Sequence, residues 1–318
     1  MNVRRLIPAA VLSTAAVLGL STLTACSGSS SAAAHKDGKL DVVASFYPMQ
    51  YLAERIGGDH VAVRNLTKPG VEPHDLELSP RQTASLGEAD LVVYLKGIQP
   101  AVDKAVAQSG AKHTVDAATL TALEDHGTEV GHDHEGEEHH GDSEAGADPH
   151  VWLDPVKYAE VAKGVGKALA KADPGHAADY EKNTATVVKN LGTLNEKFAA
   201  GLKTTATRTF ITTHSAFGYL AERYGLVQEG IAGIDPEAEP SPARVRELQS
   251  IAKKDHVNTV FFETLASDKT ARTLAGDTGL RTDVLDPLEG ITDKSKGADY
   301  LQVMESNLTA LQKALGAK

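Results

Sequence analysis

Three isolated histidines carry the side chains best suited to chemistry: His74 in PGVEPHDLELSP, His150 in DPHVWLDP and His214 in ITTHSAFGYL. His74 and His150 each come just before a helix start, and His214 closes an apolar strand. Ligands gather at such places in α/β folds. Neutral imidazole is a common zinc ligand, so three converging rings would make a metal site. A single histidine is more often a hydrogen-bonded structural residue, and spacing alone does not show convergence, so both interpretations stand at this level.

Residues 124–148 form the most biased stretch of the chain, with five histidines, ten acidic residues and no lysine or arginine. Such a composition cannot form a hydrophobic core, so we expect a solvated loop. Imidazole and carboxylate both ligate zinc, which favours an accessory loop that collects metal over a loop whose sequence drifts freely. The histidines of this accessory metal loop are His126, His132, His134, His139 and His140.

The elements that must position these side chains follow an alternating pattern. Short β-branched runs alternate with helical patterns, which is typical of α/β lobes. The runs lie at 40–46, 61–67 and 90–95, then at 208–214, at 257–263 and in a segment ending at Leu285. Helix starts are indicated where a capping side chain precedes proline, at Ser79-Pro80, Asp154-Pro155, Asp173-Pro174 and Ser241-Pro242. We therefore interpret Asp154 as a cap and not as a ligand.

The longest helical periodicity runs from Pro174 to Leu202, and its apolar face comprises Tyr180, Val187, Leu191, Leu194, Phe198 and Leu202. A helix of that length spans about 43 Å at 1.5 Å per residue, long enough to brace two lobes. The sequence thus predicts an α/β protein with two α/β lobes bridged by one long helix. The expected segments are a first lobe at 40–172, including the loop at 124–148, a linking helix at 173–203 and a second lobe at 204–318.

The amino-terminal segment is typical of an exported lipoprotein. Arg4 and Arg5 precede an apolar stretch, Leu6–Leu20, that is too short and alanine-rich to span a bilayer comfortably. The following LTAC resembles a lipobox, in which Cys26 is acylated and becomes the new amino terminus. We predict a signal peptide at 1–25, lipidation at Cys26, and a flexible tether at 26–39. The alternative is a buried cysteine behind an uncleaved anchor.

Composition excludes several classes of protein. With 41% hydrophobic residues, the chain has enough apolar side chains for hydrophobic cores, so global disorder is excluded. A formal net charge of −11 repels phosphate backbones, so we expect no nucleic-acid partner. The chain has one cysteine and therefore no disulfide of its own. H-E-x-x-H and G-x-S-x-G motifs are absent from the sequence, which argues against a zinc hydrolase and for a protein that is not an enzyme.

Four segments, EPHDLELSP, DPHVWLDP, THSAFGYL and VLDPLEGIT, occur together with the lipobox, the histidine-rich loop and the long helix. In order and spacing they resemble the metal-site segments of the solute-binding lipoproteins of zinc-uptake ABC transporters. The resemblance covers nearly all of the chain after the signal peptide. It implies two α/β lobes joined by a rigid helix, with a metal held in the cleft between them.

The resemblance also implies the ligands. His74 and His150 would come from the first lobe and His214 from the second, and VLDPLEGIT offers Glu289 or Asp286 as the fourth. We favour Glu289, because Asp286-Pro287 is also a ready turn or cap; in some relatives water takes this position. Related manganese-binding proteins carry a carboxylate in place of His214. Three imidazoles and one carboxylate suit tetrahedral Zn²⁺, whereas manganese prefers more oxygen ligands.

The function implied is capture of Zn²⁺ as cargo at the outer face of the cell membrane and its delivery to an ABC permease with its ATPase. The protein would be monomeric and held to the membrane by its lipid anchor. The alternatives are a manganese-binding homologue or a metal-dependent adhesin and, less favoured, a zinc hydrolase. Turnover of ester or peptide substrates would favour the hydrolase, and stoichiometric zinc binding without turnover the transport component.

Overall fold

The computed structural model describes residues 38–126 and 147–318 of the 318-residue chain. The first sheet has four parallel strands in the order β2-β1-β3-β4. Central Val42 is paired with Val63 on one side and with Leu91 on the other. Such a strand needs apolar residues on both faces, which explains the adjacent Val42 and Val43. The strands are β1 (Leu40–Ala44), β2 (Val61–Asn65), β3 (Leu91–Tyr94) and β4 (Thr114–Asp116).

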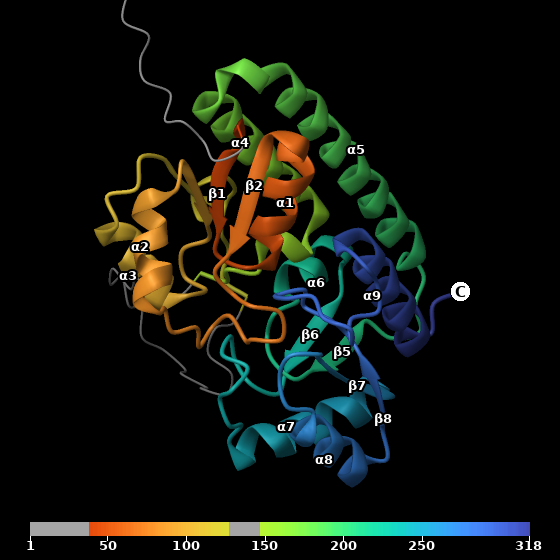
Figure 1. Cartoon of the computed structure of the whole chain (residues 1–318). Helices are drawn as coiled ribbons and strands as arrows, with labels where there is room; N and C mark the ends of the chain where they lie inside the picture. Colours follow the sequence, from red (N-terminus) through yellow and green to blue (C-terminus); the bar gives the residue numbers. More distant parts are fainter. Residues whose placement is uncertain (1–37, 127–146) are drawn as a thin grey trace, which may run out of the picture. The chain divides into compact units, whose positions relative to one another are not determined.

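Helices cover both faces of this sheet (Figure 1). Alternate residues of the central strands point to opposite faces. Val43 and Val92 therefore join the cluster under α2 (Pro80–Glu88) and α3 (Pro100–Gln108). Their neighbours in the strands join the larger cluster with α1 and α4. These two helices are α1 (Tyr47–Gly57) and α4 (Pro155–Ala172).

The second sheet repeats this topology, with parallel strands in the order β6-β5-β7-β8. Ile211 and Val260 face α7 and α8, whereas Phe210 and Phe261 face the larger cluster, to which α6 and α9 also contribute. The strands are β5 (Thr209–Thr212), β6 (Val227–Gly230), β7 (Thr259–Phe262) and β8 (Arg281–Val284). The helices are α6 (Gly218–Tyr224), α7 (Pro242–Lys254), α8 (Lys269–Thr278) and α9 (Tyr300–Leu315).

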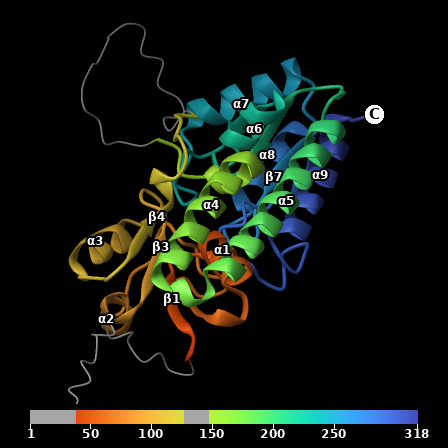
Figure 2. The same cartoon turned by 90° about the horizontal axis from the view of Figure 1, so that it is seen from above.

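One long helix, α5 (Ala177–Gly201), contacts elements of both lobes. It lies against α1 and α4 of the first lobe and against α9 of the second, and Figures 1 and 2 show it running past all three. Its buried face comprises Tyr180, Val187, Leu191, Leu194 and Phe198, the face predicted from the periodicity. A single hydrophobic cluster continues from β1 through α5 to α9. The predicted fold class of two α/β lobes bridged by one long helix is confirmed.

The start of the long helix differs from the prediction. Pro174–His176 form a 3₁₀ turn, and the α-helix begins at Ala177, so it has 25 residues and spans about 37 Å. Asp173 does not cap it through a backbone N–H. Its Oδ2 instead accepts hydrogen bonds from His176 Nδ1 at 2.6 Å and Tyr180 Oη at 2.8 Å. The carboxylate of Asp173 therefore accepts hydrogen bonds from side chains and not, as expected, from the backbone N–H groups at the start of the helix.

The other three predicted caps form as expected. Ser79 and Gln82 make a reciprocal capping box at α2, Asp154 accepts from Val156 N–H at α4, and Ser241 accepts from Arg244 N–H at α7. Within residues 38–126 and 147–318, no helix is both long and apolar enough to cross a bilayer.

Candidate metal centre

His214 and Glu263 lie at the carboxyl ends of two adjacent strands of the second sheet. β5 ends at Thr212 and β7 at Phe262, and the chain order reverses between these strands, which is where open α/β sheets bind ligands. Glu263 Oε1 lies 2.7 Å from His214 Nδ1 and also accepts from Thr213 Oγ1. Because a carboxylate only accepts hydrogen bonds, Nδ1 carries the proton, and Nε2, on the other side of the ring, lies 3.3 Å from Glu289 Oε1.

His150 is fixed in the same way in the first lobe. It precedes a 3₁₀ turn, Val151–Leu153, and is fully buried. Asp148 Oδ1 accepts from the backbone N–H of His150 at 2.9 Å and from its Nδ1 at 2.8 Å. The Nε2 atom then points to Glu289 Oε1, 3.2 Å away. Two residues on, Trp152 Nε1 donates to the Pro287 carbonyl, which ties this turn to the loop that carries Glu289.

His74 lies in the irregular loop between β2 and α2, with its side chain 10% exposed. Its backbone N–H donates to Glu72 Oε1 at 3.2 Å, and buried Leu76 anchors the loop. His74 Nε2 lies 3.4 Å from Glu289 Oε1. The loop thus brings a third imidazole to the same carboxylate from a different part of the first lobe.

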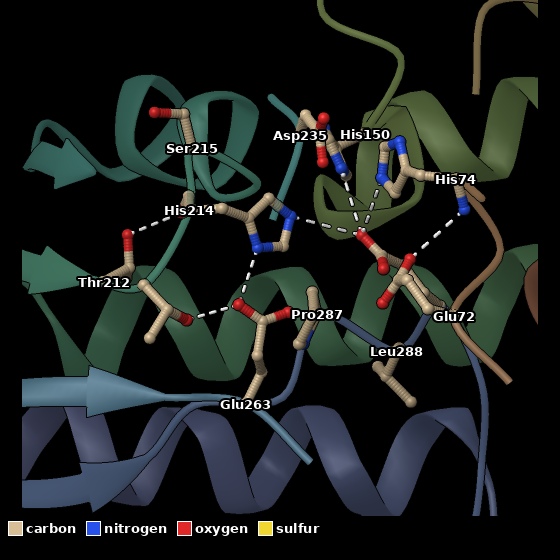
Figure 3. Close-up of polar contacts among 12 residues, drawn as sticks. Glu72, His74, His150, Thr212, His214, Ser215, Asp235, Glu263, Pro287 and Leu288 are labelled. Atoms are coloured by element: carbon tan, nitrogen blue, oxygen red, sulfur yellow. Dashed lines mark hydrogen bonds and ion pairs between the residues drawn. The ribbon is translucent and has the colours of Figure 1, made fainter. Parts of the chain in front are cut away.

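The four side chains converge on one point, and Figure 3 shows the labelled residues His74, His150 and His214 gathered around it. Glu289 Oε1 lies 3.2, 3.3 and 3.4 Å from the Nε2 atoms of His150, His214 and His74, and one ligand atom from each residue lies within 4.8 Å of the others. His74 Nε2, His214 Nε2 and Glu289 Oε2 are buried without a hydrogen-bond partner. Buried polar atoms normally have partners, so these atoms fit a bound ligand of positive charge.

Asp286, the alternative fourth ligand, has other partners. Its Oδ1 accepts from Leu288 N–H at 2.9 Å and its Oδ2 from Thr264 Oγ1 at 3.1 Å. Its backbone is held by Asn307, which donates to the carbonyl and accepts from the N–H. Leu288 then takes a positive φ of 60°, which turns the next residue, Glu289, toward the histidines.

The charges of the site are strongly coupled. Burial alone would raise the pKa of Glu289, but the charge of His74, the hydrogen bond from His150 and the nearby ring of His214 hold that pKa well below its usual value. Burial would lower the pKa of His214, yet Glu263 and Glu289 raise it well above the usual value. The pKa of His150 is also raised, against its burial, by Asp148 and Glu289. The neighbouring groups thus favour the negative charge of Glu289 and the positive charges of His150 and His214.

Three further carboxyl groups belong to the site and were not identified from sequence. Asp148 and Glu263 orient the histidines, and Glu72 lies beside Glu289, where burial and the Glu289 charge raise its pKa to about 10. Asp148 stands two residues before His150 in DPH, and Glu263 ends the apolar strand VNTVFFE. Their positions beside His150 and at a strand end could have identified both carboxylates from the sequence. Glu72 had none beyond its closeness in sequence to His74.

His126 is the one accessory-loop histidine within the described residues, and His132, His134, His139 and His140 lie outside them, as does Cys26. His126 Nδ1 lies 3.0 Å from Asp148 Oδ2, and its Nε2 lies 2.8 Å from Glu222 Oε2. The hydrogen bond to Asp148 raises the pKa of His126 to about 9, against its partial burial and with help from Glu222. His126 is therefore near the principal cluster but not part of it.

Comparison with known proteins gives consistent results. A family model described as zinc-uptake complex component A, periplasmic, matches residues 42–314. The zinc-binding lipoprotein AdcA of Streptococcus pneumoniae is 37% identical over 300 residues, which are 91% of this chain and 58% of AdcA. The high-affinity zinc uptake system protein ZnuA of Bacillus subtilis is 38% identical over 304 residues, which are 93% of this chain and 94% of that protein. This chain thus spans little more than half the length of AdcA.

Solved structures match most of the chain as well. The Zn(II)-bound ZnuA-like domain of Streptococcus pneumoniae AdcA superposes with a TM-score of 0.72 at 34% identity, covering 87% of this chain and 99% of that one. The laminin-binding protein Lmb of Streptococcus agalactiae, described as bifunctional with adhesin and metal transporting activity, gives a TM-score of 0.75 at 33% identity, with the same coverage.

Proposed function

Because the chain belongs to the family of zinc-uptake complex component A, we propose that it is the extracytoplasmic zinc-binding component of an ABC importer. It captures Zn²⁺ as cargo and delivers it to a membrane permease driven by an ATPase, with no catalytic step of its own. The observation that carries this proposal is the convergence of three Nε2 atoms on the carboxylate of Glu289.

Three of the six ligand-to-ligand distances match those expected around a tetrahedral ion. Zinc lies about 2.0 to 2.1 Å from nitrogen and oxygen ligands, which places two ligands of a tetrahedron about 3.3 Å apart. The distances from Glu289 Oε1 to the three Nε2 atoms are 3.2 to 3.4 Å. A cation at the centre would also give partners to His74 Nε2 and His214 Nε2. We therefore assign His74, His150, His214 and Glu289 as the zinc ligands.

The donor set supports zinc as the physiological cargo. Three imidazoles to one carboxylate make a nitrogen-rich site, whereas Mn²⁺ favours more oxygen ligands and a higher coordination number. Asp148 and Glu263 hold the Nδ1–H of two ligands, and such outer carboxylates fix the tautomer and raise the basicity of the metal-binding nitrogen. With Glu289 at the fourth position, the site keeps no open position for the activated water that a zinc hydrolase needs.

We assign the protein to the outer face of the cell membrane, anchored by acylated Cys26 after removal of residues 1–25, and treat it as monomeric. The LTAC segment and the lipoprotein relative AdcA support this placement. The histidines of the loop at 124–148 serve as accessory collectors and are not needed by the principal site. Adhesion is a second candidate role, favoured by the bifunctional description of Lmb.

Zinc titration of the mature chain, with chelator competition, tests the principal assignment. His74→Ala, His150→Ala and His214→Ala should each weaken one tight event by orders of magnitude, while His113→Ala, which removes an exposed histidine elsewhere, should leave it unchanged. Wild-type affinity in all three ligand variants would refute the assignment. Growth of a deletion strain in chelator-treated medium tests the import role, which is wrong if growth is unchanged and no redundant binder is present.

A further inference from the structure

The segment that carries His150 belongs to the first lobe, but side chains of the second lobe hold it in several places. This His150 segment, residues 148–154, is buried at every position. Trp152 Nε1 donates to the Pro287 carbonyl at 2.7 Å, and Tyr300 Oη donates to the Trp152 carbonyl at 2.6 Å. Helix α6 adds a contact at each end of the segment. The placement of His150 therefore depends on groups outside its own lobe.

Tyr219 of α6 holds the first end of the segment. Its hydroxyl donates to the Asp148 carbonyl at 2.7 Å and accepts from the Glu124 N–H at 2.8 Å. Burial raises the pKa of Tyr219, which keeps the donated proton on the hydroxyl. Gly218 allows α6 to come close, because a Cβ there would lie 2.9 Å from Asp148 Oδ2. Since Asp148 Oδ1 orients the ring of His150, Tyr219 fixes the backbone of the residue that orients a proposed ligand.

Arg223 holds the other end of the segment, and it lies one helical turn beyond Tyr219 on the same face of α6. Its Nε and Nη2 atoms donate to Oδ2 of Asp154 at 2.9 and 2.6 Å. The other oxygen of Asp154 accepts from the Val156 N–H and caps α4. The Asp154 side chain is 2% exposed, so its charge needs a partner. The guanidinium group thus joins α6 to the point where the His150 segment enters α4.

The same helix is joined closely to His214. Only residues 215–217 lie between His214 and Gly218, the first residue of α6, and all three are buried. The ring centroids of His214 and His150 lie 5.4 Å apart. One short helix therefore follows one proposed ligand directly and contacts both ends of the segment that carries another.

We propose that Tyr219 and Arg223 are positioning residues for zinc, which fix the separation of His150 and His214 before the ion arrives; this inference rests on the proposed zinc-binding function. The two residues act through the His150 segment and not by contact with the ion. A site whose ligands are already in place costs less ordering when the ion binds. Without either contact, the segment gains freedom in the metal-free protein, and zinc binding must restore its order. Affinity falls for that reason although every ligand is present.

The test is chelator competition for zinc with the mature chain and its variants Tyr219→Phe, Arg223→Met and Arg223→Lys. Tyr219→Phe should bind zinc roughly 3- to 10-fold more weakly, the range that one neutral hydrogen bond can supply. Arg223→Met should lose a similar amount, because the guanidinium is 37% exposed and partly screened, and Arg223→Lys should recover part of it. In the metal-free variants, amide hydrogen exchange at residues 148–154 should be faster than in the wild type. With Co²⁺ in place of zinc, the visible absorption typical of a tetrahedral site should be weaker.

Two matched variants make the same changes away from the His150 segment. Tyr224→Phe removes another hydroxyl of α6, which donates to Asn195 of α5. Arg55→Met removes an arginine that also pairs between the lobes, with Asp299, the N-cap of α9. Both controls should keep zinc affinity within twofold of wild type, together with the wild-type exchange at the segment and the wild-type Co²⁺ spectrum.

Tight zinc binding in the wild type with unchanged affinity in Tyr219→Phe and Arg223→Met would overturn this inference and leave the proposed function intact. Equal losses in the two controls would overturn it too, as would lower stability in thermal unfolding without faster exchange at 148–154. If Arg223→Met does not fold, Tyr219→Phe and Arg223→Lys decide the outcome. Absence of tight zinc binding in the wild type would instead contradict the proposed function, and this inference with it.

Discussion

Glu263 accepts the Nδ1–H of His214 and so leaves Nε2 available to the proposed zinc ion. The variant Glu263→Gln therefore tests the reasoning about the principal site without removing a proposed ligand. Both side chains are nearly inaccessible to solvent, and the Oε1 to Nδ1 distance is 2.7 Å. Glutamine preserves the shape of the side chain but removes its charge. Its amide can also donate to Nδ1, which would place the ring proton on Nε2, the atom that faces Glu289.

The size of the effect follows from the type of hydrogen bond that is lost. A hydrogen bond to a charged group contributes about 1.5 to 3 kcal/mol and a neutral one about 0.5 to 1.5 kcal/mol. The difference of about 1 to 1.5 kcal/mol corresponds to roughly 5- to 15-fold in affinity, at the lower end of the 10- to 100-fold cost typical of such supporting residues. We expect zinc binding in Glu263→Gln to be about tenfold weaker than in the wild type.

The deficit should depend on pH in a defined direction. Glu263 and Glu289 raise the pKa of His214 in the metal-free protein, so protons compete with zinc for the wild-type ring. Removing the Glu263 charge lowers that pKa and relieves part of the competition at low pH. The deficit is therefore smallest in acid and grows as the pH rises and the wild-type His214 loses its proton.

Chelator competition across a pH series measures this directly, with thermal unfolding of the metal-free variant to confirm that it folds. Glu305→Gln is a matched control, because Glu305 pairs with Lys197 on an exposed face of α9 and α5. Affinity within twofold of wild type at every pH, alongside a large loss in His214→Ala, would show that Glu263 does not support the ligand.

Other predictions concern the remaining parts of the site and the anchor. Glu289→Gln should weaken zinc binding in chelator competition. Asp286→Asn should mainly lower the unfolding free energy of the metal-free protein, by about 1 to 3 kcal/mol in denaturant titration, because an amide donor replaces one of the two oxygens that accept from Leu288 N–H and Thr264 Oγ1. The reverse pattern would exchange their roles. The raised pKa values of His150 and His214 predict that zinc binding releases protons and weakens as the pH falls. Calorimetry in buffers of different ionisation enthalpy measures this proton release. Binding heats that do not depend on the buffer would contradict the prediction. Cys26→Ala should release protein into the medium or leave an unprocessed precursor on immunoblots, and normal processing with retention would argue against the anchor.

The fold could largely be predicted from local signals, since buried parallel strands appear as apolar runs and helix caps as short motifs. The prediction missed β4 and β6, each at one edge of its sheet, whereas the other two edge strands, β2 and β8, fall within predicted runs. β4 has three residues and β6 has four, mostly half-exposed, so neither contains a continuous apolar run. The prediction that Asp173 caps the long helix was wrong because its carboxylate accepts from His176 and Tyr180 instead. These competing partners are recognisable only once the turn is folded.

The positions of the three histidines were recognisable from sequence, but the groups that make them a metal site were not. Asp148 and Glu263 act on rings two and 49 residues away, and the longer of these separations is bridged only because β5 and β7 are neighbours in the sheet. Local patterns contain no information about which strand ends meet. The choice between Glu289 and Asp286 depended in the same way on Asn307, a buried residue of α9 that holds the Asp286 backbone. Tertiary contacts that fix each side chain's direction therefore distinguish the proposed ligands from their neighbours, so tests of the carboxylates are more informative about the proposed site than further removal of histidines.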